Sequence, residues 1–252
     1  MIQEQFPVGD AVGIEVSASS GSVVLEEGAA HRVLVEVDTR RPEAWRVYQS
    51  GDTVYVTYER GFIDSGGRAR VRVAAPAGSS LTAQTASADV RSTLGHSHVS
   101  VATASGDISV EGAGSATLKT ASGDVALGDV ETHLEVRSAS GDVVARSVGG
   151  RAILTTVSGD VRLDRVDGDL VVSTASGDVR IARYGGEDLE ASTVSGDVWL
   201  ALPAGRTVEL DARTFSGSVD LPERKQTQTA GGPPVSVRMK SVSGNIRITR
   251  AD

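Results

Sequence analysis

Six aspartates recur at nearly constant spacing in this chain, and together they could act as ligands. Each follows Ser-Gly in one of the repeated hexapeptides TASGDI, TASGDV, SASGDV and TVSGDV, and the six positions are Asp107, Asp124, Asp142, Asp160, Asp178 and Asp197. Carboxylates in file could bind a row of calcium ions, as in calcium-binding β-rolls. They could also be structural, because Asp in a turn commonly accepts hydrogen bonds from backbone N–H groups. The structural interpretation is favoured, since the β-roll nonapeptide is missing from the sequence.

Four arginines form a second, partial ladder beside these acids. Arg162 and Arg180 each follow an aspartate of the file by two residues, which places them on the same face of a strand. Arg165 and Arg183 form a similar pair, one repeat apart. Exposed salt bridges of modest energy are the expected role. The alternative is a patch that binds an anion or a partner, made of Arg162, Arg165, Arg180 and Arg183.

Few residues of this chain are suited to catalysis or to a dedicated metal centre. There is no Cys, and no Walker or dinucleotide-type Gly loop is present. His96 and His98, expected on one strand face, could bind a metal weakly, although surface positions without a ligand are expected for all four His. We therefore predict a non-enzymatic protein with no cofactor and no metal site, the Asp file being the one alternative for metal.

The spacing of the aspartates indicates how strands must position them. Successive aspartates are separated by about 18 residues, and other columns keep the same phase: the residue after each Asp is Val or Ile. Apolar residues alternate within each short run, which is the strand period. An antiparallel meander or a parallel β-solenoid could follow, and phase-locked columns favour the solenoid because stacked coils give each column a constant environment. We predict an all-β, right-handed parallel β-solenoid with about 18 residues per coil.

One column is ambiguous in this pattern. Three residues before each Asp stands Ala or Val, and four residues before stands Thr or Ser. Strict alternation would point the Thr/Ser column into the core and the Ala/Val column outward, and a bulge at the corner would reverse this. The sequence alone leaves both arrangements open.

The remaining segments suggest a domain organisation. Residues 1–80 are predicted to contain a first coil, over 14–25, and an irregular β-rich cap, in which HRVLVEVD and DTVYVTYE are expected to form a hairpin pair. Residues 81–221 are predicted to form the regular solenoid. A Pro- and Gly-rich stretch over 222–234 is expected to be a mobile loop, and 235–252 a terminal coil.

The repeated SGDV-type units, the PAG turn at Pro76 to Gly78 and the irregular N-terminal portion together resemble a bacterial β-strand repeat family. Its members are described as "putative adhesins" or as domains of unknown function. The resemblance covers most of the chain and implies a parallel β-helical fold, and it supplies no catalytic residue. A weaker likeness, in fold and size alone, is to bactofilins, which are cytoskeletal β-helices.

Composition limits the partners of this chain. The net charge is -8, which argues against nucleic acid as a general partner while leaving room for a local basic patch. No basic segment followed by an apolar run starts the chain, and no window has the length of a membrane helix. We expect a cytoplasmic scaffold or protein-interaction module without a membrane span, with an unknown protein partner or self-association. The alternative is an adhesin-like surface protein that binds a ligand or calcium along its Asp and Arg ladders.

Overall fold

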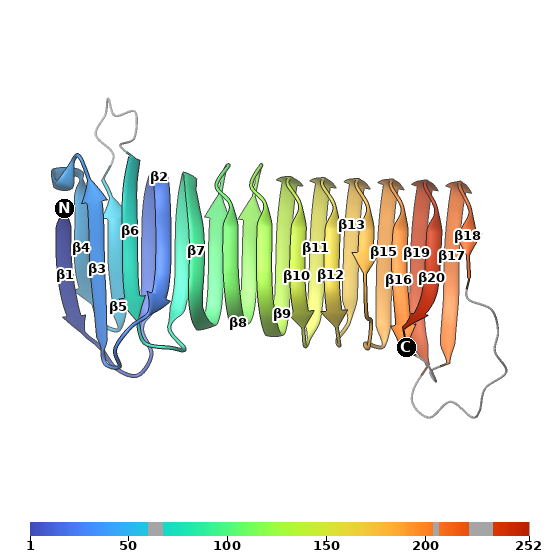
Figure 1. The fold of residues 1–252 in the computed structure, drawn as a ribbon, viewed down its shortest axis with the longest axis horizontal. Coiled ribbons are helices and arrows are strands. Elements are labelled where there is room, and N and C mark those ends of the chain that lie inside the picture. The colour runs from blue at the N-terminus through green and yellow to red at the C-terminus, as the bar shows by residue number, and fades with distance from the viewer. Residues whose placement is uncertain (60–67, 204–206, 222–233, 252) are drawn as a thin grey trace. The chain divides into compact units, whose positions relative to one another are not determined.

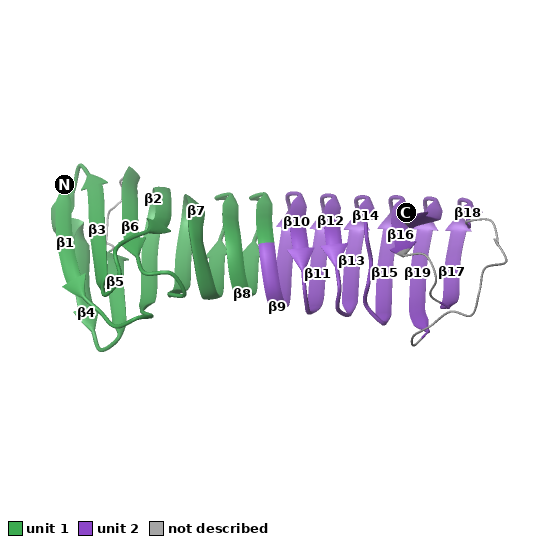
Figure 2. Cartoon of the chain, turned by 60° about the horizontal axis from the view of Figure 1, so that its bottom comes forward, with its two compact units in different colours: residues 1–128 green, residues 129–252 purple. Residues whose placement is uncertain are grey.

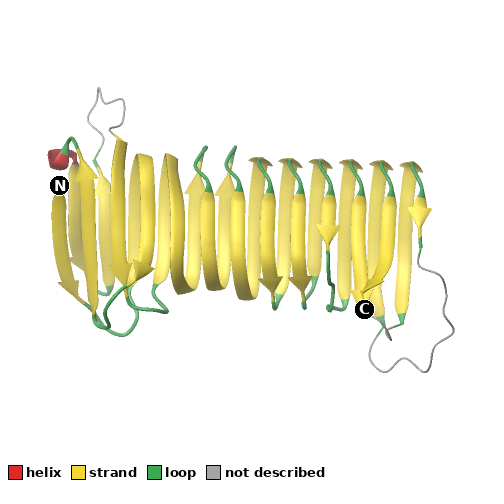
Figure 3. Cartoon of the chain, viewed as in Figure 1, coloured by secondary structure: helices red, strands yellow, loops and turns green. Residues whose placement is uncertain are grey.

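The computed structural model describes residues 1–59, 68–203, 207–221 and 234–251, and there the chain is predominantly β-strand. Within these residues the helical structure is one short 3-10 turn, η1 (Pro42–Ala44), drawn in red in Figure 3. The all-β prediction is confirmed. The loop predicted over 222–234 lies, except for residue 234, outside the described residues.

The chain divides into two compact units, Met1–Gly128 and Asp129–Asp252, coloured separately in Figure 2. The strands of unit 1 are β1 (Ile2–Pro7), β2 (Gly13–Glu27), β3 (Arg32–Thr39), β4 (Trp45–Ser50), β5 (Thr53–Tyr58), β6 (Arg68–Ala75), β7 (Ser80–Thr103) and β8 (Ile108–Thr120). β9 (Val125–Ser140) contains the boundary. The strands of unit 2 are β10 (Val143–Val148), β11 (Arg151–Ser158), β12 (Val161–Val166), β13 (Leu170–Ser176), β14 (Val179–Ile181), β15 (Asp188–Ser195), β16 (Val198–Pro203), β17 (Val208–Ser216), β18 (Val219–Asp220), β19 (Val235–Ser243) and β20 (Ile246–Ala251).

Unit 1 combines parallel coils with an antiparallel cap. β2 pairs in parallel with β7, with Ile14 opposite Leu81, so residues 14–25 form a coil as expected. The two runs predicted to be a hairpin pair are β3 and β5, and that pairing is wrong. β5 forms its hairpin with β4, whereas β3 pairs antiparallel with β1 and β6. Alternation identified both strands, but it contains no information about which neighbour each one pairs with.

Unit 2 consists of two parallel ladders, and each repeat supplies one strand to each of them (Figure 1). In one ladder β11, β13 and β15 are neighbours; in the other β12, β14 and β16 are neighbours. Val161 pairs with Val179, and Val179 with Val198, so identical repeat positions lie side by side. All three side chains are buried, which confirms that the column after the aspartates belongs to the core. The strands are therefore stacked in a solenoid-like repeat.

Burial decides which of the two adjacent columns, Thr/Ser or Ala/Val, faces the core. Thr156, Thr174 and Thr193 are buried, whereas Val157 is 58% exposed. Strict alternation therefore continues to the end of the strand, and the Thr/Ser column faces the core. Some hydroxyls of this column bond to backbone groups of the turns: in unit 1, Thr103 Oγ1 accepts the N–H of Gly106 at 3.0 Å. The buried hydroxyl of Thr174 has no hydrogen-bond partner among the described residues.

The last coils of unit 2 do not stack in the order of the sequence. β15 pairs with β19, and β19 pairs with β17. The second ladder has the same order, with β20 between β16 and β18. Residues 235–251, the last coil along the chain, thus lie between the coil of β15 and β16 and the coil of β17 and β18.

Candidate functional site

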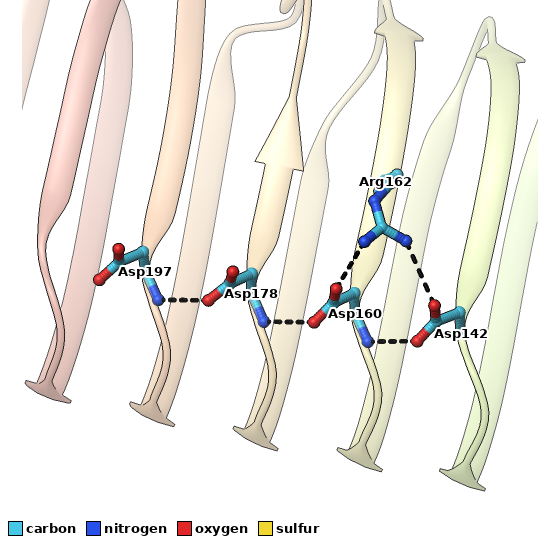
Figure 4. Close-up of polar contacts among 5 residues, drawn as sticks. All are labelled: Asp142, Asp160, Arg162, Asp178 and Asp197. Atoms are coloured by element: carbon cyan, nitrogen blue, oxygen red, sulfur yellow. Dashed lines mark hydrogen bonds and ion pairs between the residues drawn. The ribbon is translucent and has the colours of Figure 1, made fainter.

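The aspartates of each unit form a hydrogen-bonded ladder that links coil to coil. Oδ1 of Asp142 accepts the backbone N–H of Asp160 at 2.9 Å, and Oδ1 of Asp160 accepts that of Asp178 at 2.9 Å (Figure 4). Asp178 does the same for Asp197, at 2.8 Å. The acceptor role predicted from turn chemistry is thus present, and the donor belongs to the next coil rather than to the same turn.

The ladder continues with neutral residues and also occurs in unit 1. Asp197 Oδ1 accepts the N–H of Asn245, and the amide oxygen of Asn245 accepts the N–H of Ser218 at 3.0 Å. In unit 1, Oδ1 of Asp107 accepts the N–H of Asp124 at 3.0 Å. Because Asn replaces Asp without loss of the bond, the ladder requires an oxygen acceptor and not a charge.

A backbone bond runs in the opposite direction at the same place. The N–H of Val161, next to Asp160, donates to the carbonyl of Asp178 at 2.8 Å. The N–H of Gly159 also donates to the carbonyl of Ser176 at 3.0 Å, so side-chain and main-chain bonds together hold the neighbouring turns. The Gly before each Asp allows this close approach: a Cβ on Gly159, whose φ is +135°, would collide with the carbonyl oxygen of Gly141.

A positive φ explains this glycine in only some of the repeats. Gly141, Gly159 and Gly177 have positive φ, whereas Gly106 and Gly123 are not among the positive-φ residues. A Cβ on Gly106 would nevertheless collide with the carbonyl oxygen of Ala88. The requirement common to both units is therefore close packing of turn upon turn.

Arg162 neutralises part of the acidic file. Its guanidinium bridges two coils, with Nη1 3.2 Å from Asp142 Oδ2 and Nη2 2.6 Å from Asp160 Oδ2 (Figure 4). The oxygens of these two carboxylates that the ladder does not use are thereby engaged. The expected salt-bridging role of this arginine is confirmed, and Arg162 and Arg180 are in register on neighbouring strands.

Trp199 extends the column of Arg162 and Arg180, and the sequence pattern did not predict it as a site residue. Arg180 is opposite Trp199 on β16, and Trp199 is opposite Arg247 on β20. The arginines are exposed and the indole is half-buried. We call these residues, Arg180, Trp199 and Arg247, the Arg/Trp stripe. Its signal in the sequence is that each residue stands two positions after the Asp or Asn of its repeat.

Arg165 and Arg183 lie together in a shallow depression of unit 2, lined also by Arg146, Ser147, Asp129 and Asp164. Arg146 forms a double hydrogen bond with Asp129, at 3.0 and 2.6 Å, and this holds the pKa of the Asp129 carboxyl below its usual value. Arg165 binds Asp167 at 2.8 Å. The depression therefore contains charges of both signs. The four arginines proposed as one patch are divided between this depression and the column that includes the stripe.

The structure shows no metal cluster in the part of the chain that it describes: no group of three or more His, Asp or Glu side chains is placed to hold an ion. His96 and His98 do not share a face, which corrects the expected pair. His96 is 4% exposed and His98 is exposed, because the alternation that runs from Val90 to His96 breaks after His96, where Ser97 and His98 both face solvent.

His96 also corrects the expectation that all four His lie at the surface. Its Nε2 is 2.7 Å from Ser92 Oγ, and its Nδ1 is 2.8 Å from the carbonyl oxygen of Ser79. Burial lowers the pKa of this imidazole. A Ser beside a His suggests a nucleophile and base, but Ser92 is fully buried, so substrate has no access to it.

Comparison with solved structures places the fold among known ones. A "putative lipid binding protein" from Parabacteroides distasonis has a TM-score of 0.51 at 11% identity, covering 100% of this chain and 96% of that chain. A "putative adhesin" from the same species has a TM-score of 0.49 at 12% identity, with coverages of 98% and 96%. A "putative adhesin" from Bacteroides fragilis has a TM-score of 0.46 at 14% identity, also with coverages of 98% and 96%. At 11% identity, the likeness to the first of these proteins concerns the fold alone.

Further comparisons concern curated proteins and protein families. No curated protein matches this sequence. The weaker likeness to bactofilins finds no support in the comparisons. Among the described residues, no helix has the length and apolar character needed to cross a membrane. A family model described as Toastrack DUF4097 matches residues 12–249, and the chain therefore belongs to the Toastrack DUF4097 family.

Proposed function

We propose that this protein is a non-catalytic protein-interaction module whose contact surface is the Arg/Trp stripe. In this proposal the module is a right-handed solenoid with about 18 residues per coil. The observation that carries the proposal is the position of Trp199 between Arg180 and Arg247 on three neighbouring strands. Trp and Arg are the residue types most enriched where binding energy is concentrated in protein interfaces.

The stripe is suited to binding because its strands are already fixed. β14, β16 and β20 are neighbours in one parallel ladder, so the strands are about 4.8 Å apart and the backbone loses little conformational freedom when a partner docks. Arg180 forms no ion pair with the described residues, in contrast to Arg162. The guanidinium of Arg180 is therefore available to an acidic group of a partner.

The Asp ladder supports a structural role rather than a ligand-binding one. In unit 2, Oδ1 of Asp142, Asp160, Asp178 and Asp197 is used between coils. A calcium ion at these oxygens would compete with backbone donors. The adhesin-like alternative would therefore use the Arg/Trp stripe toward an acidic sugar polymer, and not the Asp file toward calcium.

Selection from a random peptide library on the immobilised protein tests the proposal. Selected peptides should bind with a Kd that rises about tenfold or more in Trp199→Ala and Arg180→Gln, as expected for interface hot spots. Arg151→Gln removes the same charge from an exposed position elsewhere in unit 2 and should change the Kd less than about twofold.

Binding of the protein to an array of acidic glycans tests the adhesin-like alternative. Glycan binding that depends on Trp199, without peptide binding, would favour the adhesin-like function. Peptide binding that is insensitive to both stripe variants would contradict the proposed contact surface.

A further inference from the structure

The coil of β17 and β18 is the end of unit 2 in space, and its core side chains are only partly covered. β17 pairs with β19 and β18 with β20, and no other described strand pairs with either. Leu210 is 37% exposed, whereas Leu189, two strands away in the same column, is 2% exposed. Val219 is likewise 37% exposed, against 0% for Val198. The core thus reaches the surface at this end.

The outer edge of β17 presents backbone groups that can bind another strand. The N–H of Val235 donates to the carbonyl of Thr207, so Thr207 faces β19. In a parallel ladder, alternate residues of a strand bond to the same neighbour. Glu209, Asp211 and Arg213 therefore also face β19, and Leu210, Ala212 and Thr214 direct their N–H and C=O groups to the open side.

Among the described residues, the charges along this edge are of both signs and so do not uniformly repel a second copy. Exposed edges are commonly protected by Pro, by bulges, by charged side chains or by a covering segment. β17 has the sequence VELDARTFS, without Pro, and its outward side chains include both acids and a base. Asp211 and Arg213 are exposed or half-buried, and their own ion pair of 2.7 Å lies at the surface. A second copy of the strand would meet opposite charges as well as like ones.

Charge selects one register for such a copy. If two β17 strands run antiparallel about a two-fold axis at Ala212, Asp211 of each copy faces Arg213 of the other, and no like charges are opposed. Centring on Asp211 or Arg213 places that residue against itself, and centring on Leu210 places Glu209 against Asp211. Centring on Thr214 gives no opposite-charge pair. Only the register about Ala212 gives two attractive pairs without a repulsive one.

The hydrogen-bonding pattern of the β17 backbone fits the same register. Ala212 directs its N–H and C=O outward, so two copies of Ala212 exchange both hydrogen bonds. Asp211 and Arg213 then occupy the non-hydrogen-bonded positions, where facing side chains are closest. Leu210 of each copy then lies opposite Thr214 of the other, and the second copy covers part of the exposed core column.

We propose that two copies of this chain form a symmetric dimer by antiparallel pairing of β17 about Ala212. The partner is a second copy because the edge is self-complementary in charge and in backbone pattern. The dimer is independent of the Arg/Trp stripe, so either proposal can fail without the other.

Sedimentation velocity of the purified full chain tests the dimer. The native protein should change from monomer to dimer with rising concentration, as mass action requires. Arg213→Asp and Asp211→Arg should each remain monomeric, since each opposes two like-charged pairs. An equimolar mixture of the two variants should form a one-to-one heterodimer, because all cross-pairs are then attractive.

Two controls make the result specific. Arg151→Asp reverses a charge on β11, away from β17, and should dimerise as the native chain does. Ala212→Pro removes an outward N–H and no bond to β19, and should be monomeric with an unfolding midpoint near that of the native chain. A monomeric native protein, an open-ended series of larger species, or a mixture that fails to associate would each overturn the proposal.

Discussion

Oδ1 of Asp160 accepts the backbone N–H of Asp178, 2.9 Å away and in the next coil, while Oδ2 of the same carboxylate binds Arg162 at 2.6 Å. One side chain thus connects two turns and balances its own charge. The repulsion expected among stacked carboxylates is offset by N–H donors and by this guanidinium. At Asp142 and Asp160, a side chain of the protein itself therefore balances part of the acidic charge.

Replacement of Asp178 tests whether the ladder needs an acceptor or a charge. Asp178→Asn keeps the oxygen that accepts the N–H of Asp197, so the free energy of unfolding should change by less than about 0.5 kcal/mol. Asp178→Ala leaves that N–H without its acceptor and should cost about 1–2 kcal/mol. Urea unfolding measures both, and equal losses in the two variants would contradict the acceptor role.

Calcium should have no effect on the stability of the native protein. Because the ladder oxygens are engaged by N–H groups, we expect the same melting temperature with millimolar calcium and with a chelator. A melting temperature that rises with calcium concentration, and rises less in Asp160→Asn, would indicate binding to the native state by mass action. That result would restore the calcium interpretation of the Asp file.

Val161 and Val157 provide a matched pair for the two faces of one coil. Val161 is 0% exposed, so Val161→Asp places a charge in the core and should cost several kcal/mol, about enough to unfold a marginal domain. Val157→Asp introduces the same group on the exposed face and should change stability by about 0.5 kcal/mol or less. Similar melting temperatures for the two variants would show that the assignment of faces is wrong.

Gly159 should tolerate no side chain. Gly159→Ala adds a Cβ that collides with the Gly141 carbonyl oxygen, so neighbouring turns must separate and the melting temperature should fall clearly. Gly9→Ala is the control, because a Cβ on Gly9 has no atom within 4 Å. If both variants melt together with the native protein, the close approach of turns is not required for stability.

His96 should make stability depend on pH. Burial lowers its folded-state pKa below the value of the unfolded chain, about 6.5, so the unfolded state binds the proton more readily. Stability is therefore fully present above pH of about 6.5 and is lost as the pH falls below it. Urea unfolding of the native protein should give a smaller free energy at pH 5 than at pH 7.5, values that span about this pKa.

Two histidine variants assign that pH dependence. His96→Gln should flatten it between these two pH values, while His98→Gln, at an exposed position, should retain it. A dependence that disappears in His98→Gln and persists in His96→Gln would show that His96 is not its source.

The sequence alone determined which residues become neighbours within the regular repeats. A parallel stack gives every coil the same environment, so a column of identical residues indicates a shared position. Spacing and alternation therefore suffice to assign Val161, Val179 and Val198 to the core, and Asp160 and Asp178 to neighbouring turns. The acceptor role of the aspartates follows from turn chemistry, although the coil that supplies the donor does not.

Only the tertiary structure decided the features that depend on bends in the chain and on which strands pair with each other. The burial of Thr156 rather than Val157 required the backbone to stay regular up to the turn. The separation of His96 from His98 required a break in alternation after His96, where Ser97 and His98 are both exposed. Neither the partner of β5 nor the place of β19 between β15 and β17 can be read from spacing, because strands with the same alternation can pair with any edge. The exposed end at Leu210 follows from that order, since the coil of β17, and not the last coil along the chain, is left uncovered among the described strands.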